Sequence, residues 1–217
     1  LPVRLLAASR ASDILEPDDG RIFRRFKGRG DPEREALVMK HVADHAFPVP
    51  RVLETRPDGL LLERIEGPTM FEDMKRRPWR LRRAARVLAE LHRRLHAIPA
   101  PATLPAVGPG DAVLHLDLHP LNVLLAPRGP VVIDWTNARR GEPALDAALT
   151  YVIAATSGGR LGRLFARAFV AHFDPDHVAR GLPAAVDFRL RDANVRDSER
   201  EAVRRLASRF IVHSPSR

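Results

Sequence analysis

The sequence predicts an α+β fold in two lobes, a small β-rich N-terminal lobe with one helix and a larger, mainly helical C-terminal lobe. Short apolar segments separated by turn residues fill most of the first 65 residues, and only one segment there has helical periodicity. After residue 70 the apolar residues recur mainly at helical spacing. We therefore divide the chain into two predicted domains, residues 1–66 and 67–217.

The N-terminal lobe is predicted to contain a small sheet and one helix. Its strand candidates cover residues 3–7, 14–15, 22–26, 52–53 and 59–62, with a hairpin turn signal at Asp18-Asp19-Gly20. Asp31 followed by Pro32 predicts a helix start, and this helix is expected to run to about His45. Its apolar face is expected to contain Ala36, Met39, Val42 and Ala43.

The C-terminal lobe is predicted to be built mainly from helices. Helical segments are expected at 70–75, 79–96, 143–155 and 161–173, and a Pro- and Gly-rich loop is expected at 99–110. The pattern Ser198-x-x-Glu201 is typical of a capping box, so a last helix should follow it and reach about residue 212.

Composition excludes several classes of protein. There is no cysteine, so disulfides and thiolate metal sites are impossible. No apolar run has the length of a membrane span, and residues 1–8 lack the features of a signal peptide, so we expect a cytoplasmic protein without membrane partners. The formal charge is +9, but the arginines are spread along several predicted helices and aromatic residues are few, which argues against nucleic-acid binding.

Residues 115–122, with the sequence His-Leu-Asp-Leu-His-Pro-Leu-Asn, form the most informative segment. In an extended segment residues two apart share a face, so we expect His115, Asp117 and His119 to point one way and the two intervening leucines the other. The leucines would anchor the segment to a core, and Asp117 would stay available for chemistry.

A hairpin is predicted directly after this segment, with strands at 122–126 and 130–133 around an Ala-Pro-Arg-Gly-Pro turn. Asn122 opens the hairpin and Asp134 closes it, so both polar side chains are expected at the same end. Their oxygens suit Mg²⁺, which also binds phosphate oxygens. With Asp117 as a base for an acceptor hydroxyl, the set meets the needs of a Mg-ATP-dependent phosphoryl transferase.

Two other interpretations of these residues stay open at this point. The histidines and aspartates could be surface loop residues, although such loops do not need regular alternation with leucine. His-x-Asp-x-His could instead ligate zinc or iron in a metal-dependent hydrolase, because imidazole suits both metals. That site would need further ligands, and the nearest candidates are Asp134 and Asp146.

The patterns His-x-Asp-x-His-x-x-Asn and Ile-Asp-Trp resemble those of the aminoglycoside phosphotransferase family, relatives of the eukaryotic protein kinases. The resemblance implies a protein-kinase-like two-lobed fold, with ATP and Mg²⁺ as cofactors. It makes Asp117 the catalytic base, beside His115 and His119, and makes Asn122 and Asp134 the magnesium ligands. Protein kinases have lysine at the position of His119, so the histidine favours the small-molecule kinases.

The segment Gly-Glu-Pro-Ala-Leu-Asp at 141–146 also resembles this family. Its aspartate, here Asp146, is implied to brace the catalytic loop rather than to take part in chemistry.

Kinases hold the nucleotide phosphates with a strand lysine that pairs with a helix glutamate. Alignment on the Ile-Phe pair of the third strand candidate puts Arg24 at the lysine position, and Arg25 or Lys27 would serve in another register. Arginine grips phosphate in a bidentate way but is not equivalent to lysine. We predict Glu35 as the helix partner, with Glu33 as the alternative.

The remaining nucleotide contacts are predicted near residues 8–13 and 63–67. The first segment should cover the phosphates; it contains no glycine, but Ser9 and Ser12 could donate to phosphate. The second should be the hinge, where backbone groups around Glu63 and Ile65 would bind adenine. The missing glycines and lysine leave a different class open, a nucleotide-binding regulatory protein of pseudokinase type with little turnover.

The acceptor is expected to be a small molecule with a hydroxyl group, bound on the C-terminal lobe. From residue 160 onward there are seven Asp and Glu residues against twelve Arg. Aminoglycosides are polycations and call for a carboxylate-lined pocket. The arginine excess therefore favours a neutral or anionic acceptor.

Overall fold

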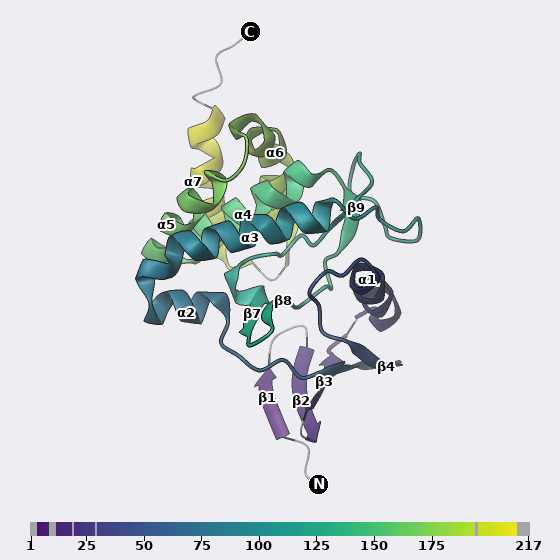
Figure 1. The fold of residues 1–217 in the computed structure, drawn as a ribbon. Coiled ribbons are helices and arrows are strands. Elements are labelled where there is room, and N and C mark those ends of the chain that lie inside the picture. The colour runs from purple at the N-terminus through teal and green to yellow at the C-terminus, as the bar shows by residue number, and fades with distance from the viewer. Residues whose placement is uncertain (1–3, 9–11, 19, 29, 194, 212–217) are drawn as a thin grey trace.

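The computed structural model describes residues 4–8, 12–18, 20–28, 30–193 and 195–211 (Figure 1). Along the chain the elements are β1 (Arg4–Ala8), β2 (Ser12–Asp18), β3 (Arg21–Phe26), α1 (Pro32–Asp44), β4 (Val52–Arg56), β5 (Gly59–Glu63), α2 (Met70–Arg76), a 3₁₀ turn (Pro78–Arg80), α3 (Leu81–His96), β6 (Ala112–Leu114), a second 3₁₀ turn (Pro120–Asn122), β7 (Val123–Ala126), β8 (Gly129–Val132), β9 (Arg139–Gly141), α4 (Pro143–Ser157), α5 (Gly159–Val170), α6 (Pro175–Arg191) and α7 (Asp197–Ile211). This mixture of helix and strand confirms the predicted α+β class.

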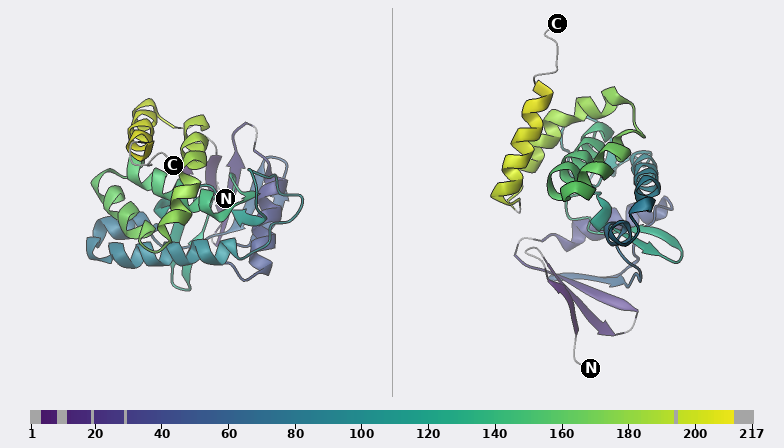
Figure 2. Two further views of the ribbon diagram at one scale, coloured as in Figure 1. Left: turned by 90° about the horizontal axis from the view of Figure 1, so that it is seen from above. Right: turned by 90° about the vertical axis from the view of Figure 1, so that its left-hand side faces the viewer.

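The N-terminal part is an antiparallel five-stranded sheet in the order β1-β2-β3-β5-β4, with α1 packed against it (Figures 1 and 2). Asp31 caps α1 as predicted, because its side chain accepts a hydrogen bond from the Arg34 N–H at 3.0 Å. The helix buries Val38, Met39 and Val42 in the core. Arg24 of the central strand β3 pairs with Glu35 of α1, so strand and helix together fix the side chain that faces the C-terminal part.

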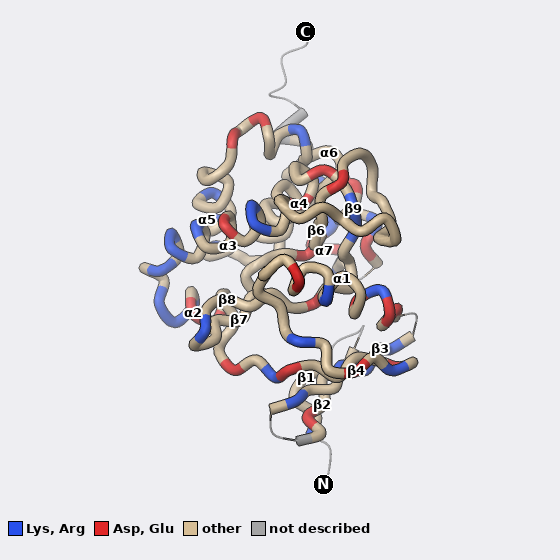
Figure 3. The backbone as a smooth tube through the Cα atoms, turned by 45° about the vertical axis from the view of Figure 1, so that its right-hand side comes forward, with Lys and Arg blue, Asp and Glu red and all other residues tan. Residues whose placement is uncertain are grey.

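The C-terminal part is a helical bundle around α4. Ten of the fifteen residues of α4 are buried, since α3, α5, α6 and α7 all contact it. The predicted amphipathic face of α3 is confirmed: Leu88, Leu91 and Leu95 are all buried. In the described part of the chain no helix combines the length and the apolar character that a membrane crossing needs. Basic residues are spread over both parts of the molecule in Figure 3.

The β7–β8 hairpin confirms the strand pairing predicted after residues 115–122, which we call the catalytic segment because of their predicted role. Val123 pairs with Val132, and Ala126 pairs with Gly129 at the turn. Asn122 directly precedes β7, and the Asn122 carbonyl accepts a hydrogen bond from the Ile133 N–H at 3.0 Å. The hairpin therefore brings Asn122 close to Asp134 at one end.

Two features of the C-terminal helices differ from the prediction. Helix α6 was not predicted, although Asp174 caps it and Pro175 occupies its first position. The capping box at Ser198 is wrong, because α7 begins at Asp197 and Ser198 already lies in its first turn. In both segments many arginines interrupt the apolar residues, so the helical periodicity was too weak to mark where the helix begins.

Candidate active site

The catalytic segment is not the extended strand that its alternating pattern predicts. Leu116 has a φ of 59°, in the left-handed region that a leucine rarely adopts. This turn in the backbone reverses the alternation: Leu116 packs with the α4 and α6 side chains, and Leu118 packs in the other core cluster. The leucines anchor the segment as expected, but they do so in two separate cores.

Asp146, from the first turn of α4, holds this strained backbone in place. Its carboxylate accepts hydrogen bonds from the N–H groups of His115 at 3.0 Å and Leu116 at 2.8 Å, and His96 Nε2 lies 3.0 Å away. Asp146 is completely buried. Burial alone would raise its pKa, but the His96 hydrogen bond and the other donors bring the pKa well below the ordinary value. A fixed negative charge therefore lies beneath the loop, as the predicted brace requires.

The expectation that His115 points the same way as Asp117 is wrong. The His115 ring is completely buried, contacts Trp135 at a centroid distance of 4.7 Å, and donates from Nε2 to the Ile133 carbonyl at 3.1 Å. Burial lowers its pKa, so the ring is neutral near pH 7. His115 therefore joins the catalytic segment to the end of β8 and has no surface with which to touch an acceptor.

Asp117 is held by two neighbours in its own loop. The Asn122 amide nitrogen donates to Asp117 Oδ2 at 3.0 Å and to the Asp117 carbonyl at 2.9 Å. His119 Nδ1 accepts from the Leu121 N–H at 3.3 Å, which leaves Nε2 to carry a proton toward Asp117 Oδ1, 3.3 Å away. The carboxylate is thus oriented yet partly exposed, the state a general base needs.

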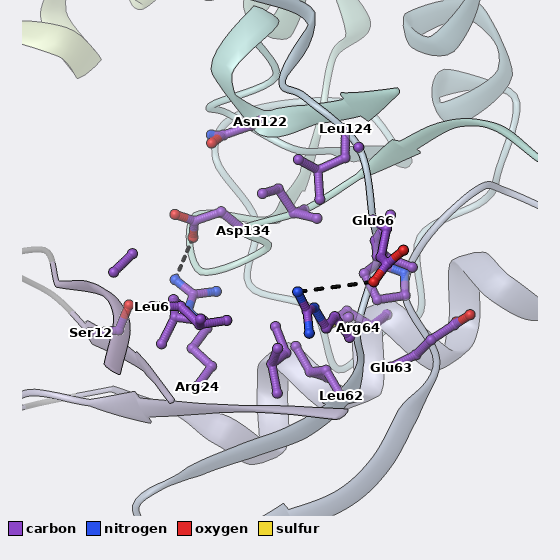
Figure 4. Close-up of a pocket in the computed structure, with 18 of the residues that line it drawn as sticks. Leu6, Ser12, Arg24, Leu62, Glu63, Arg64, Glu66, Asn122, Leu124 and Asp134 are labelled. Atoms are coloured by element: carbon purple, nitrogen blue, oxygen red, sulfur yellow. Dashed lines mark hydrogen bonds and ion pairs between the residues drawn. The ribbon is translucent and has the colours of Figure 1, made fainter. Parts of the chain in front are cut away.

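Asn122 and Asp134 both line a cavity of about 530 Å³ between the two lobes (Figure 4). Asp134 has a φ of 65°, a conformation that aspartate tolerates better than most residues. Because the Asn122 amide nitrogen is used in the bonds to Asp117, its oxygen is the atom left for a cation. A carboxylate and a carboxamide oxygen facing a cavity fit the donor preference of Mg²⁺.

Arg24 faces these residues from β3 and connects both lobes. It forms a buried ion pair with Glu35 of α1, and its other terminal nitrogen lies 2.6 Å from Asp134 Oδ1 and 3.0 Å from Thr136 Oγ1. Its Nε donates to Ser12 at 3.3 Å. The predicted partnership of Arg24 with Glu35 is therefore present in the structure (Figure 4 shows the contact to Asp134).

The other registers considered for the phosphate-binding residue do not reach the cavity. Arg25 and Lys27 both form ion pairs with Asp13, and Glu33 is exposed. For Arg25 the reason is the alternation of side chains along β3, because a residue next to Arg24 must lie on the opposite face of the sheet.

The charge on Asp134 is set by this arrangement. Burial would raise its pKa, but the guanidinium of Arg24 outweighs burial and lowers the pKa below the ordinary value. The pKa of Arg24 is raised, because Asp134 and Glu35 outweigh its own burial. Asp134 is thus a carboxylate, ready to bind a cation at neutral pH.

The predicted hinge lines the same cavity at the end of β5. Residues 62–67 all contribute to the lining. The Glu63 carboxylate itself is bound by Arg128 at 2.6 Å and points away from the other labelled side chains (Figure 4). Any nucleotide contact at Glu63 or Ile65 would therefore involve backbone groups. Ser12 also lines the cavity, whereas Ser9 lies outside the described residues.

Two residues near the site were missed by sequence reasoning. Thr136 donates to Glu35 Oε2 at 3.1 Å and contacts Asp134, and His96 contacts Asp146. Thr136 lies two residues after the metal-ligand candidate, and that closeness was a usable signal. Nothing local links His96 to Asp146, because the two are fifty residues apart.

A transition-metal centre finds no support here. Within the residues that the structure describes, no three His, Cys, Asp or Glu side chains are placed to hold a metal ion together. Among the described residues the hydrolase alternative therefore has no observation in its favour.

Residues 99–186 match the family model described as the phosphotransferase enzyme family. The structure of aminoglycoside phosphotransferase APH(4)-Ia superposes with a TM-score of 0.73 at 15% identity, covering 98% of this chain and 94% of that chain. The chain has the aminoglycoside phosphotransferase fold. The predicted resemblance is confirmed by both findings.

Kinases of amino alcohols share this phosphotransferase fold. A choline/ethanolamine kinase family protein from Mesorhizobium loti has a TM-score of 0.66 at 18% identity, covering 99% of this chain and 89% of that chain. An ethanolamine kinase from Plasmodium vivax has a TM-score of 0.66 at 12% identity, covering 95% of this chain and 81% of that chain. No curated protein sequence matches the chain. At these identities the likeness concerns the fold, and acceptors differ among the neighbours.

Proposed function

We propose that this protein is an ATP- and Mg²⁺-dependent phosphotransferase that moves the γ-phosphate to a hydroxyl of a small molecule. The acceptor is neutral or anionic rather than an aminoglycoside, and the protein acts in the cytoplasm. One observation carries the proposal: Asn122, which donates to Asp117 at 3.0 Å, lies on one side of the interlobe cavity and the Arg24–Glu35 pair on the other, with Asp134 in contact with Arg24. A complex of a thermostable APH(4)-Ia variant with AMP-PNP and hygromycin B supports the use of this fold for nucleotide and acceptor together.

The proposed reaction assigns one task to each residue. Asp117 orients the acceptor hydroxyl and takes its proton as the oxygen attacks the γ-phosphorus. The bond between that phosphorus and the bridging oxygen breaks, and ADP leaves. Asn122 and Asp134 would hold magnesium, which supplies charge neutralisation on the phosphates. Arg24, fixed by Glu35, binds the non-reacting phosphates, and the hinge backbone around Ile65 binds the base.

The test is product formation across a panel of hydroxyl compounds, followed by phosphorus NMR with Mg-ATP. Asp117→Asn is the matched control, since the amide keeps the shape of the side chain and cannot accept the proton. A phosphorylated product formed by the wild type and not by the variant supports the proposal. Tight Mg-ATP binding with no product from any acceptor would contradict it and favour a nucleotide-binding regulator.

A further inference from the structure

A second cavity, of about 230 Å³, lies beside the catalytic loop on the side of the C-terminal helices. His119 and Leu121 of the loop form one wall, so the cavity adjoins the group that contacts Asp117. Helices α2, α4, α5, α6 and α7 supply the other walls. An acceptor bound here would touch His119, whose Nε2 lies 3.3 Å from the carboxylate of the proposed base.

The body of this cavity is apolar. Met74, Ile153 and Phe165 are buried at its floor, and Phe71 and Leu121 lie at less buried positions. Leu121 is half exposed, at 50%, which is unusual for a leucine within a catalytic loop. Leu121 lies between His119 and Asn122, and its exposed part is apolar surface that a ligand in the cavity could contact.

The only charged pair among the residues that line the cavity is already matched. Glu199 Oε1 accepts from Arg189 at 2.5 and 2.9 Å and from Ser157 at 2.6 Å. Arg189 also donates to Asp192 at 3.2 Å. Both side chains of the pair are only 16% exposed. A cationic acceptor would compete with Arg189 for Glu199, and an anionic acceptor would compete with Glu199 for Arg189.

We infer that this cavity binds the acceptor and selects a neutral alcohol with a compact apolar body, its hydroxyl directed toward Asp117. The inference rests on the proposed function for the transfer step and narrows the acceptor class within it. Apolar burial supplies the binding energy, and the Arg189–Glu199 pair disfavours substrates that carry charge.

Selectivity is measured with an alcohol series of increasing apolar size, with kanamycin and a hydroxy acid as charged competitors. Each buried methylene should raise kcat/KM about fourfold until the cavity is full. The charged compounds should be at least about tenfold poorer than the best neutral alcohol. A preference for kanamycin or the hydroxy acid would overturn the inference.

The contribution of the loop to this cavity is tested with Leu121→Asp. Because Leu121 is half exposed, we expect the variant to fold. We expect a loss of about tenfold or more in kcat/KM for neutral alcohols. Leu164→Asp is the matched control, because Leu164 is 48% exposed on α5 and does not line this cavity. Equal behaviour of the two variants would overturn the inference.

Binding of the same alcohols, measured by calorimetry in the presence of AMP-PNP, separates the two proposals. Alcohols that bind the wild type but not Leu121→Asp, without transfer, would support the cavity and refute the phosphotransferase function. Transfer to other acceptors without any binding of alcohols would refute the cavity and leave the proposed function standing.

Discussion

The two sides of the interlobe cavity are held in place by different means. On the C-terminal side the catalytic loop is fixed by backbone N–H groups that donate to the buried Asp146, and no ligand is needed for this. On the N-terminal side Arg24 is shared between Glu35 and Asp134, and Asp134 is itself the proposed metal ligand. The proposed base is therefore preorganised. The proposed phosphate grip, which is Arg24 with its partner Glu35, depends instead on a balance of charges that a bound nucleotide would change.

Removal of the base should have the largest effect on activity. Asp117→Asn should lower kcat by about 10²–10⁴-fold, the usual contribution of a general base, because the amide cannot take the hydroxyl proton. The affinity for AMP-PNP, measured by calorimetry, should stay within about twofold of the wild type. A variant with full activity would show that Asp117 only positions the acceptor.

The anchor beneath the loop should matter mainly for stability. Asp146→Ala removes a buried charge and leaves the N–H groups of His115 and Leu116 and the His96 ring without their acceptor. We expect a loss of about 3–5 kcal/mol in the free energy of unfolding, measured with urea. Glu54→Ala is the control, since this exposed carboxylate pairs with the exposed Arg56 side chain and its removal should cost less than about 1 kcal/mol.

The phosphate grip should show a graded response. Arg24→Lys keeps the charge but cannot contact Glu35, Asp134 and Ser12 at once, so kcat/KM for ATP should fall about tenfold, as expected for one lost charge-assisted hydrogen bond. Arg24→Ala should lower kcat/KM for ATP further, because no positive charge then remains beside Glu35 and Asp134. An unchanged or higher kcat/KM in Arg24→Lys would show that a point charge is sufficient.

The same contrast explains what could be predicted from the sequence. Asp117, Asn122 and Asp134 are joined by a hairpin, so local turn signals were enough to bring Asn122 and Asp134 together. Arg24 and Glu35 could be paired from one strand and one helix. Their roles in catalysis stay predictions, although their positions agree with those roles.

Other features depend on contacts that no local pattern encodes. The left-handed Leu116 breaks the alternation of the catalytic segment, and it is tolerated because Asp146, thirty residues later, accepts its N–H. The cavity proposed to bind the acceptor is lined by residues from five helices, and the Arg189–Glu199 ion pair at its edge joins α6 to α7. Sequence charge counts suggested an arginine-rich acceptor region, whereas the structure shows that the arginine lining this cavity is paired.

A pH dependence of stability is expected on the catalytic side. His92 is completely buried beside Thr150, whose hydroxyl donates to the Leu118 carbonyl in the catalytic loop. Burial lowers the pKa of His92 to about 4. In the unfolded chain its pKa would be about 6.5, so between about pH 6.5 and 4 the unfolded state binds a proton that the folded state does not. Stability should fall with falling pH in this window, by up to about 1.4 kcal/mol per pH unit from this group.

The His115 ring, also buried with a lowered pKa, should add to the same slope. His92→Gln should therefore reduce the slope in urea unfolding without abolishing it, whereas His172→Gln, at an exposed position, should leave it unchanged. Equal slopes in the wild type and His92→Gln would mean that His92 titrates normally in the folded state. The lowered pKa of Asp134 means that its contribution to stability starts to fall only below about pH 5, where the unfolded carboxylate takes up protons. Burial raises the pKa of Glu35, so proton uptake by Glu35 in the folded state opposes the slope from the histidines. Loss of stability from about pH 6.5 to about pH 5 would then arise mainly at the buried histidines beneath the catalytic loop.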